Sequence, residues 1–295
     1  MLGTKPRRSR WLGACLVAAS ATVALAAPPA LRSTVTGHGP AMILIPGLNS
    51  PAAVWNGVVD RFKDRFTCHA VSIPGFAGEP AAASPSLPAI RDAVLAYIDD
   101  NHLERPVIVG HSLGAVVAYW VAATAPQTVG PVVAVDGVPF LPALMNPATT
   151  VDAMRPQAEA MRAMLESASA EQRDRQSAVS LSSMITDPAQ VELARRWAAS
   201  SDPHTSSQLM MELMTTDLRS EMPKIQAPLL LIAAGGLFAA QPAARVEMER
   251  AYERQVAGVS NHKTIVATGA RHFIMLDDLP FLVSAISEFL GSPAR

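Results

Sequence analysis

The chain has 295 residues, with 24 basic against 25 acidic side chains, a hydrophobic share of 49% and two cysteines. A near-neutral chain without a basic excess excludes nucleic acid as an expected partner, and two cysteines are too few for a disulfide scaffold. The length suits one large domain, or a domain with an insertion, built around a substantial hydrophobic core.

Residues 1–26 are predicted to be a secretory signal peptide. Four basic residues precede an uncharged apolar stretch, Trp11 to Ala24, and Ala24-Leu25-Ala26 places small residues where a signal peptidase requires them. A retained membrane anchor is the alternative, but the apolar stretch is short for a transmembrane helix. We therefore expect an exported protein, periplasmic or secreted, with no stable membrane anchor after cleavage.

Cleavage after residue 26 changes both the charge and the cysteine content. It removes four of the 24 basic residues and no acidic ones, which leaves 20 basic against 25 acidic residues and a formal charge of −5. Cys15 leaves with the signal peptide, so Cys68 has no partner for an internal disulfide. We expect Cys68 to be an inert buried thiol.

Short apolar runs alternate with helical patterns along residues 27–139 and 223–295. The predicted strands are Met42–Ile45, Thr67–Ile73, Pro106–Val109, Val132–Val135, Leu229–Ala233 and Thr264–Ala267. The predicted helices are Ala53–Arg61, Leu87–Asp100, Ala115–Ala125, Ala243–Val256 and Leu279–Leu290, the last with Asp278 and Gly291 as caps. Fully apolar strands that alternate with helices predict an α/β fold with a mostly parallel, doubly wound sheet.

A glycine-flanked serine, Gly110-His111-Ser112-Leu113-Gly114, directly follows the third predicted strand. Between a strand and a helix, the pattern G-x-S-x-G is typical of a nucleophile elbow, a sharp turn that presents a serine in a strained backbone conformation. The two glycines leave room where a Cβ atom would clash. An ordinary glycine-rich turn is the alternative, but it does not account for the strand before the motif and the helix after it.

Residues 140–222 interrupt the alternation because they contain no convincing strand. Helical patterns such as Val151–Ala168 and Ala189–Ala199 predict an all-helical lid inserted into the sheet fold. Nine of the chain's 13 methionines lie here: Met145, Met154, Met161, Met164, Met184, Met210, Met211, Met214 and Met222. Methionines at helical spacing usually fill a core, but their flexible apolar side chains can also line an adaptable substrate passage.

Four stretches together resemble the α/β-hydrolase fold family, and the resemblance covers nearly all of the chain after residue 26. Residues 41–48 are similar to the family's third strand and the turn after it, with Pro46 where histidine is commoner. Residues 72–78 resemble its D-x-P-G-x-G turn, with serine in place of the aspartate. Residues 110–114 match its elbow, and residues 269–275 resemble the late turn that presents its catalytic histidine. The resemblance implies the α/β-hydrolase fold and a serine hydrolase with a helical lid.

A serine hydroxyl needs a base within hydrogen-bond reach before it can act as a nucleophile. Of the seven histidines, only His272 lies just beyond the last predicted strand, in a turn that faces the elbow of a doubly wound sheet. The alternative is a histidine in a surface loop. His111 lies inside the elbow, and we expect it to point away from Ser112 and make a structural hydrogen bond.

The acid departs from the commonest pattern of the family. In most members it follows the strand that corresponds to Leu229–Ala233, but Phe238 stands here where aspartate is usual. Some members carry the acid one strand earlier, which corresponds to Asp136. We expect Asp136 to hold the tautomer of His272 and to stabilise its imidazolium form, in the order Ser112, Asp136, His272. The alternative is that Asp136 only caps the segment that follows it.

The developing oxyanion of an acyl transfer also needs hydrogen-bond donors. The backbone N–H of Leu113 is expected to supply one, and the resemblance points to the backbone N–H of Leu48 for the other. No metal-binding motif and no nucleotide-binding glycine pattern occurs in the sequence, so no metal and no cofactor are expected.

Two functions follow from these features. The first is a serine hydrolase, carboxylesterase-like or lipase-like, that cleaves a carboxylic ester or lactone of a small apolar substrate through an acyl-enzyme. The second is a binding or sensory protein with slow or no turnover, or a lyase or peroxidase variant, on the same fold. The second draws its support from Phe238, because a chain without a working acid would have a degenerate triad.

Overall fold

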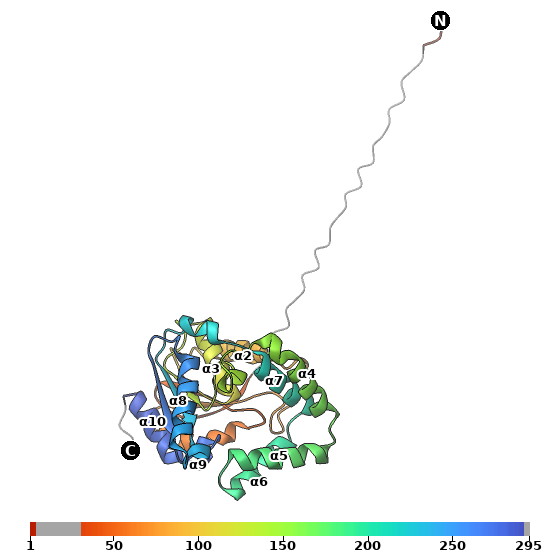
Figure 1. The fold of residues 1–295 in the computed structure, drawn as a ribbon. Coiled ribbons are helices and arrows are strands. Elements are labelled where there is room, and N and C mark those ends of the chain that lie inside the picture. The colour runs from red at the N-terminus through yellow and green to blue at the C-terminus, as the bar shows by residue number, and fades with distance from the viewer. Residues whose placement is uncertain (4–30, 292–295) are drawn as a thin grey trace.

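The computed structural model describes residues 1–3 and 31–291. Within these ranges a seven-stranded sheet forms the centre of the molecule, with strand order β1-β3-β2-β4-β5-β6-β7 (Figure 1). Neighbouring strands run parallel, except that β1 is antiparallel to β3. The strands are β1 (Arg32–Gly37), β2 (Ala41–Ile45), β3 (Thr67–Ser72), β4 (Val107–His111), β5 (Val132–Val135), β6 (Leu229–Ala234) and β7 (His262–Ala267).

Strand β1 is not among the strands that the sequence predicts. Its residues read RSTVTG, and none of them is fully buried, because β1 lies at the edge of the sheet and pairs only with β3. A strand that buries no face lacks the apolar run by which the other six are recognised. The remaining six strands lie where they are predicted, with ends that differ by at most two residues.

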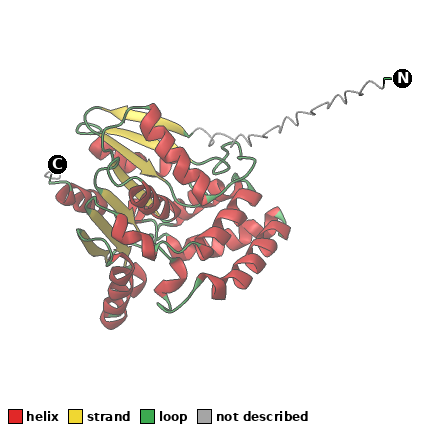
Figure 2. Ribbon diagram, turned by 90° about the horizontal axis from the view of Figure 1, so that it is seen from above, coloured by secondary structure: helices red, strands yellow, loops and turns green. Residues whose placement is uncertain are grey.

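Helices cover both faces of the sheet (Figure 2). Ile43 and Ile45 of β2 belong to a core that includes helices α2 (Leu87–Asp100), α3 (Leu113–Thr124) and α8 (Pro242–Val256). Met42 and Leu44 belong to a second core that includes α1 (Asn56–Phe62), α9 (Ile274–Asp277) and α10 (Leu279–Phe289). Since successive side chains of a strand point to opposite faces, the doubly wound α/β architecture is confirmed.

Four helices lie between β5 and β6 and form the predicted helical insertion. They are α4 (Val151–Ser167), α5 (Ala170–Met184), α6 (Pro188–Ala199) and α7 (Pro203–Thr215). They pack as two pairs, α4 with α7 and α5 with α6 (Figure 1). Of the short 3-10 helices, η1 (Ala52–Trp55) precedes α1, η2 (Leu141–Leu144) and η3 (Arg219–Lys224) flank the four helices of the insertion, and η4 (Gly236–Phe238) follows β6.

Residues 4–26 of the predicted signal peptide lie outside the described residues, so export stays a prediction. In the part of the chain that the structure describes, no helix combines the length and the apolar character needed to cross a membrane. Cys68 of β3 is a free, fully buried cysteine. Burial raises the pKa of its thiol to about 11, as expected for an unreactive packing residue.

Candidate active site

Ser112 stands at the sharp turn between β4, which ends at His111, and α3, which begins at Leu113. Its backbone has φ 53° and ψ −115°, a conformation that residues other than glycine rarely adopt. A Cβ atom at Gly110 would lie 2.1 Å from the carbonyl oxygen of Gly114, and one at Gly114 would lie 2.3 Å from that of Ile45. Both glycines are therefore sterically required, and the strain at Ser112 has the form expected of a nucleophile elbow.

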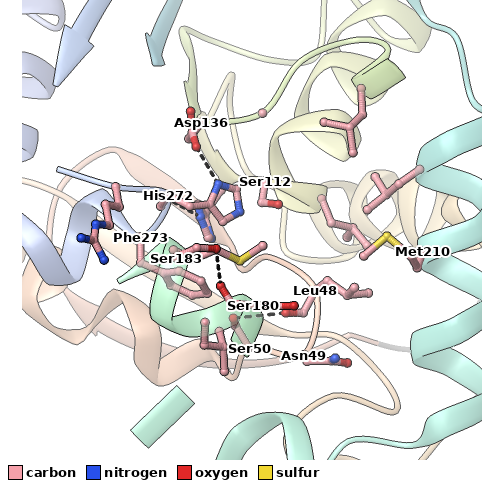
Figure 3. Close-up of a pocket in the computed structure, with 18 of the residues that line it drawn as sticks. Leu48, Asn49, Ser50, Ser112, Asp136, Ser180, Ser183, Met210, His272 and Phe273 are labelled. Carbon is pink, nitrogen blue, oxygen red and sulfur yellow. Dashed lines mark hydrogen bonds and ion pairs between the residues drawn. The ribbon is translucent and has the colours of Figure 1, made fainter. Parts of the chain in front are cut away.

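The structure brings His272 and Asp136 together, although 136 residues separate them in sequence. The Nδ1 atom of His272 donates a hydrogen bond to Oδ2 of Asp136 at 2.6 Å. Because an ionised carboxylate can only accept, Nδ1 carries the proton and Nε2 is left as the basic ring nitrogen. Figure 3 shows Ser112 beside this imidazole and Asp136 on its other side. The base and the acid that the sequence predicts thus lie at one site with the predicted nucleophile.

Asp136 directly follows β5 and is held by two further donors. Its Oδ1 atom accepts hydrogen bonds from the backbone N–H of Ala234 and from the hydroxyl of Tyr252, each at 2.8 Å. Burial alone raises the pKa of this carboxyl group, but the hydrogen bonds from His272, Ala234 and Tyr252 outweigh burial and hold its pKa below the usual value. Asp136 is therefore an ionised, fully hydrogen-bonded carboxylate.

The turn after Asp136 requires a glycine because it passes close to the elbow. Asp136 itself has a positive φ of 46°. A Cβ atom at Gly137 would lie 2.5 Å from the carbonyl oxygen of Ser112. The hydroxyl of Tyr119 donates a hydrogen bond to the carbonyl of Gly137 at 3.0 Å and anchors this turn to α3. The acid and the nucleophile are thus positioned by adjacent, mutually packed turns.

Phe238, where most of the family has its acid, belongs to the turn η4 and lines the cavity beside the site. The end of β6 contributes a backbone donor, the N–H of Ala234, to the carboxylate of Asp136. The neighbouring strand β5 supplies the carboxylate itself. His272 therefore has an acid partner even though position 238 is not an aspartate.

His111 is fully buried, and its ring lies against that of His272, with 4.6 Å between the ring centroids. Its Nε2 atom donates a hydrogen bond to the backbone carbonyl of His272 at 3.0 Å. Burial, with a smaller effect from the neighbouring His272, lowers the pKa of His111 to about 3, so its ring is neutral at physiological pH. A Cβ atom at Gly47 would lie 2.7 Å from its Nδ1 atom. His111 is thus a neutral support for the loop that carries His272, as the sequence predicts.

The two predicted oxyanion donors, the N–H groups of Leu48 and Leu113, both belong to residues that line the cavity at Ser112. Within residues 31–291, neither N–H group donates a hydrogen bond to another protein atom. Asn49, next to Leu48, has a positive φ of 60°. Its Oδ1 atom accepts a hydrogen bond from the hydroxyl of Ser206 on α7 at 2.6 Å. A helix of the insertion is therefore tied directly to the turn that contains Leu48.

A cavity of about 1070 Å³ opens above Ser112, between the core and the helical insertion. Three of the nine methionines of the insertion line it, namely Met145, Met184 and Met210. Its core side includes Leu48, Leu113 and Val116. Some methionines of the insertion thus face a cavity beside Ser112, and a cavity of this size admits a ligand of drug-like dimensions.

Three residues of the site are missing from the sequence-based prediction. Tyr252 on α8 bonds the acid, and Asn49 and Ser206 link the Leu48 turn to α7. Tyr252 and Asp136 are 116 positions apart, and no local motif marks either Tyr252 or Ser206. The one available signal is Asn49, because asparagine tolerates the left-handed backbone of a tight turn.

The chain matches the Alpha/beta hydrolase family over residues 42–285. It is 28% identical to the biotin biosynthesis bifunctional protein BioHC of Cellvibrio japonicus, over 85% of this chain and 47% of that protein. It is 32% identical to a pimeloyl-[acyl-carrier protein] methyl ester esterase of Aeromonas hydrophila, over 35% of this chain and 40% of the esterase. The chain thus spans less than half the length of these curated relatives.

A hydrolase from Pseudomonas aeruginosa of known crystal structure has the same fold, with a TM-score of 0.74 and 20% sequence identity. The similarity covers 89% of this chain and 94% of that one. The family match spans the elbow, the Asp136 turn and the His272 turn together. The chain therefore belongs to the alpha/beta hydrolase family.

Proposed function

We propose that this protein is a serine hydrolase that cleaves a carboxylic ester or lactone through an acyl-enzyme. The observation that carries the proposal is the hydrogen bond from His272 to Asp136 beside the strained Ser112. This arrangement turns Nδ1 of His272 toward Asp136 and leaves Nε2 to take the serine proton, which is the requirement for nucleophilic catalysis by a hydroxyl. The ester-cleaving relative from Aeromonas hydrophila supports the choice of bond.

The proposed reaction begins with attack of Ser112 Oγ on the carbonyl carbon of the substrate. His272 Nε2 takes the hydroxyl proton, and Asp136 stabilises the imidazolium that forms. The N–H groups of Leu48 and Leu113 bind the oxyanion of the tetrahedral intermediate. His272 then gives its proton to the leaving alcohol, and an acyl group stays on Ser112. Water, deprotonated by His272, releases the acid and restores the serine.

The second function, a binding or sensory protein with a degenerate triad, rests on the missing aspartate at position 238. Its premise is weakened because Asp136 Oδ2 lies 2.6 Å from His272 Nδ1. The free N–H groups of Leu48 and Leu113 further favour an acyl-transfer enzyme.

Hydrolysis of p-nitrophenyl esters of graded acyl length tests the proposed function. We expect turnover by the wild-type protein and loss of turnover in the variant Ser112→Ala, which removes the nucleophile and keeps the elbow. The matched control is Ser200→Ala, which removes the hydroxyl of an exposed serine at the end of α6. Equal rates in the wild type and Ser112→Ala would contradict the proposal.

Export through a signal peptide cleaved after Ala26 is part of the same proposal. The basic residues before an apolar stretch and the small residues at positions 24 and 26 support it. We expect the protein isolated from the exported fraction to begin at Ala27, as read by mass spectrometry of its N-terminal peptide. An exported protein that retains Met1 would contradict the predicted cleavage.

A further inference from the structure

The two sides of the cavity above Ser112 differ in chemical character. One side is apolar and combines residues of α3 and α7 with the segment after β5: Val116, Val138, Met210 and Leu213. The opposite side comes from α5 and carries most of the polar groups, Arg173, Gln176, Ser177, Ser180 and Ser183, although Leu181 and Met184 of the same helix also line it. In Figure 3, Met210 lies on one side of Ser112, and Ser180 and Ser183 lie on the other.

The polar side lies next to His272, because the end of α5 is hydrogen-bonded to the loop that carries this histidine. The backbone N–H of Phe273 donates to the carbonyl of Met184 at 3.2 Å. The guanidinium of Arg271 donates to the carbonyl of Ser182 at 2.7 Å and to that of Ile185 at 3.2 Å. Figure 3 likewise shows Ser180 and Ser183 on the side of His272 and Phe273.

The position of His272 decides which side of the cavity binds the alcohol part of an ester and which side binds its acyl chain. His272 must hand its proton to the oxygen of the leaving alcohol, so that alcohol has to lie on the His272 side of the reacting carbon. The carbonyl oxygen faces the N–H groups of Leu48 and Leu113. The acyl chain takes the remaining direction, toward Met210 and Leu213. The polar side therefore receives the alcohol, and the apolar side receives the acyl chain.

The free polar groups on the α5 side are neutral. In the described chain, the hydroxyls of Ser177 and Ser180 and the amide of Gln176 make no hydrogen bond to protein, whereas the Ser183 hydroxyl donates to the carbonyl of Ser180. The charged groups nearby are already engaged. Arg173 donates to the carbonyl of Ala168, Asp174 pairs with Arg195, and Arg271 binds the two carbonyls at the end of α5. What remains is a set of uncharged donors and acceptors, which matches free hydroxyl groups.

We propose that the preferred substrate is an ester of an apolar acyl chain with a small neutral polyol, such as glycerol, whose free hydroxyls bind Gln176, Ser177 and Ser180. This inference rests on the proposed hydrolase function and specifies its substrate class. In the reaction the bond between the acyl carbon and the polyol oxygen breaks, and that oxygen receives the proton from His272. Water then supplies the hydroxyl of the released carboxylic acid, so that ester and water give acid and polyol.

The test compares two esters that share one acyl group, 1-monooctanoylglycerol and n-propyl octanoate. They differ only in the two free hydroxyls of the alcohol. Each neutral hydrogen bond contributes about 0.5–1.5 kcal/mol, so two of them raise kcat/KM for the glycerol ester by roughly 5- to 150-fold over the propyl ester. The double variant Ser177→Ala/Ser180→Ala, which keeps Gln176, is expected to lower this ratio several-fold. The matched control is Ser182→Ala, since the Ser182 hydroxyl bonds the carbonyl of Ala178 within α5 and does not line the cavity; it should keep the wild-type ratio.

The outcomes separate this inference from the proposed function. If a fluorophosphonate labels Ser112 and the wild type shows no preference for the glycerol ester, or cleaves neither ester, the inference is wrong and a serine nucleophile stands. If Ser112 is not labelled in the folded protein, the proposed function fails and the inference fails with it. A preference for the glycerol ester that is as large in the Ser177→Ala/Ser180→Ala variant as in the wild type would also overturn the assignment of these hydroxyls. Higher kcat/KM for the 3-phosphate of monooctanoylglycerol would contradict a neutral alcohol site.

Discussion

At the scale of single residues, the most informative position is Asp136. Three donors converge on its carboxylate: His272, the backbone of Ala234 and the hydroxyl of Tyr252. Two of these bonds go to one oxygen atom and leave the other for the histidine. This division holds the carboxylate in one orientation and so fixes the orientation of the imidazole ring.

Replacement of the acid should show its role directly. In Asp136→Asn the carboxylate becomes an amide that does not stabilise the imidazolium, so we expect kcat to fall by up to ~10⁴, the loss seen when a triad acid is replaced in this way.

Tyr252→Phe removes one hydrogen bond to the same carboxylate and should lower kcat by roughly 2- to 10-fold, since one such bond is worth about 1 kcal/mol. Steady-state kinetics on a p-nitrophenyl ester measures both effects. Wild-type turnover in Asp136→Asn would show that Asp136 is not the acid partner of His272.

His111 makes the stability of the fold sensitive to pH. Its pKa in the folded protein is about 3, whereas an exposed histidine titrates near 6.5. Between these two values the unfolded chain binds the proton and the folded chain does not, so the free energy of unfolding falls as the pH drops below about 6.5. The lowered pKa of Asp136 acts mainly at lower pH, below the ordinary value of 3.8.

We expect His111 to contribute a loss of up to about 1.4 kcal/mol per pH unit in the pH range below 6. Guanidinium unfolding at pH 7, 5.5 and 4.5 measures it. In His111→Gln, which keeps a side-chain donor and cannot titrate, the dependence on pH should be weaker than in the wild type. Parallel stability curves for the two proteins would show that His111 is protonated in the folded state as readily as in the unfolded chain.

At the scale of secondary-structure elements, two of the contacts between the insertion and the core reach the turn of Leu48 and the loop of His272. Helix α7 contacts the Leu48 turn through the bond from Ser206 to Asn49. The end of α5 is bonded to the His272 loop, and the N–H and hydroxyl of Thr186 donate to Asp277 four residues after Phe273, at 2.8 and 3.0 Å. Both pairs of helices in the insertion thus contact loops that carry candidate catalytic groups.

The Ser206–Asn49 bond predicts that Ser206 affects catalysis through the position of Leu48, without touching the substrate itself. Loss of this hydroxyl in Ser206→Ala frees Asn49 and lets the neighbouring Leu48 N–H shift from its position at the oxyanion. Because that donor acts in the transition state, kcat should fall several-fold with little change in KM. The conservative variant Ser206→Thr retains the hydroxyl and should restore kcat. A change confined to KM, or a loss that Ser206→Thr does not rescue, would argue against this positioning role.

At the scale of the whole molecule, the sequence predicts the elements that bury apolar faces. Six of the strands follow from short apolar runs, and most of the helices that cover them follow from the helical patterns between those runs. Asp278 caps α10 through a bond to the N–H of Phe281, as its position suggests. Strand β1 is not predicted because its side chains are largely exposed and it is held mainly by backbone pairing. A strand with largely exposed side chains has no periodic apolar pattern by which it could be recognised in the sequence.

The site follows the same division between local and long-range information. Ser112 is marked by a five-residue motif, and Asp136 and His272 can be placed because the carboxyl ends of parallel strands meet at one edge of the sheet. Tyr252, Ser206 and the polar face of α5 depend on how helices far apart in sequence pack over that edge. No local pattern encodes this packing, so they emerge only from the folded structure.

The central claim, that Ser112 is a nucleophile activated by His272 and Asp136, is tested most directly by a fluorophosphonate probe with the labelled residue mapped by mass spectrometry. Our account predicts one phosphonylated residue, Ser112, in the folded wild-type protein, much slower labelling in Asp136→Asn, and no labelling in Ser112→Ala. A folded wild-type protein that the probe does not label, or labels at another residue, would contradict it.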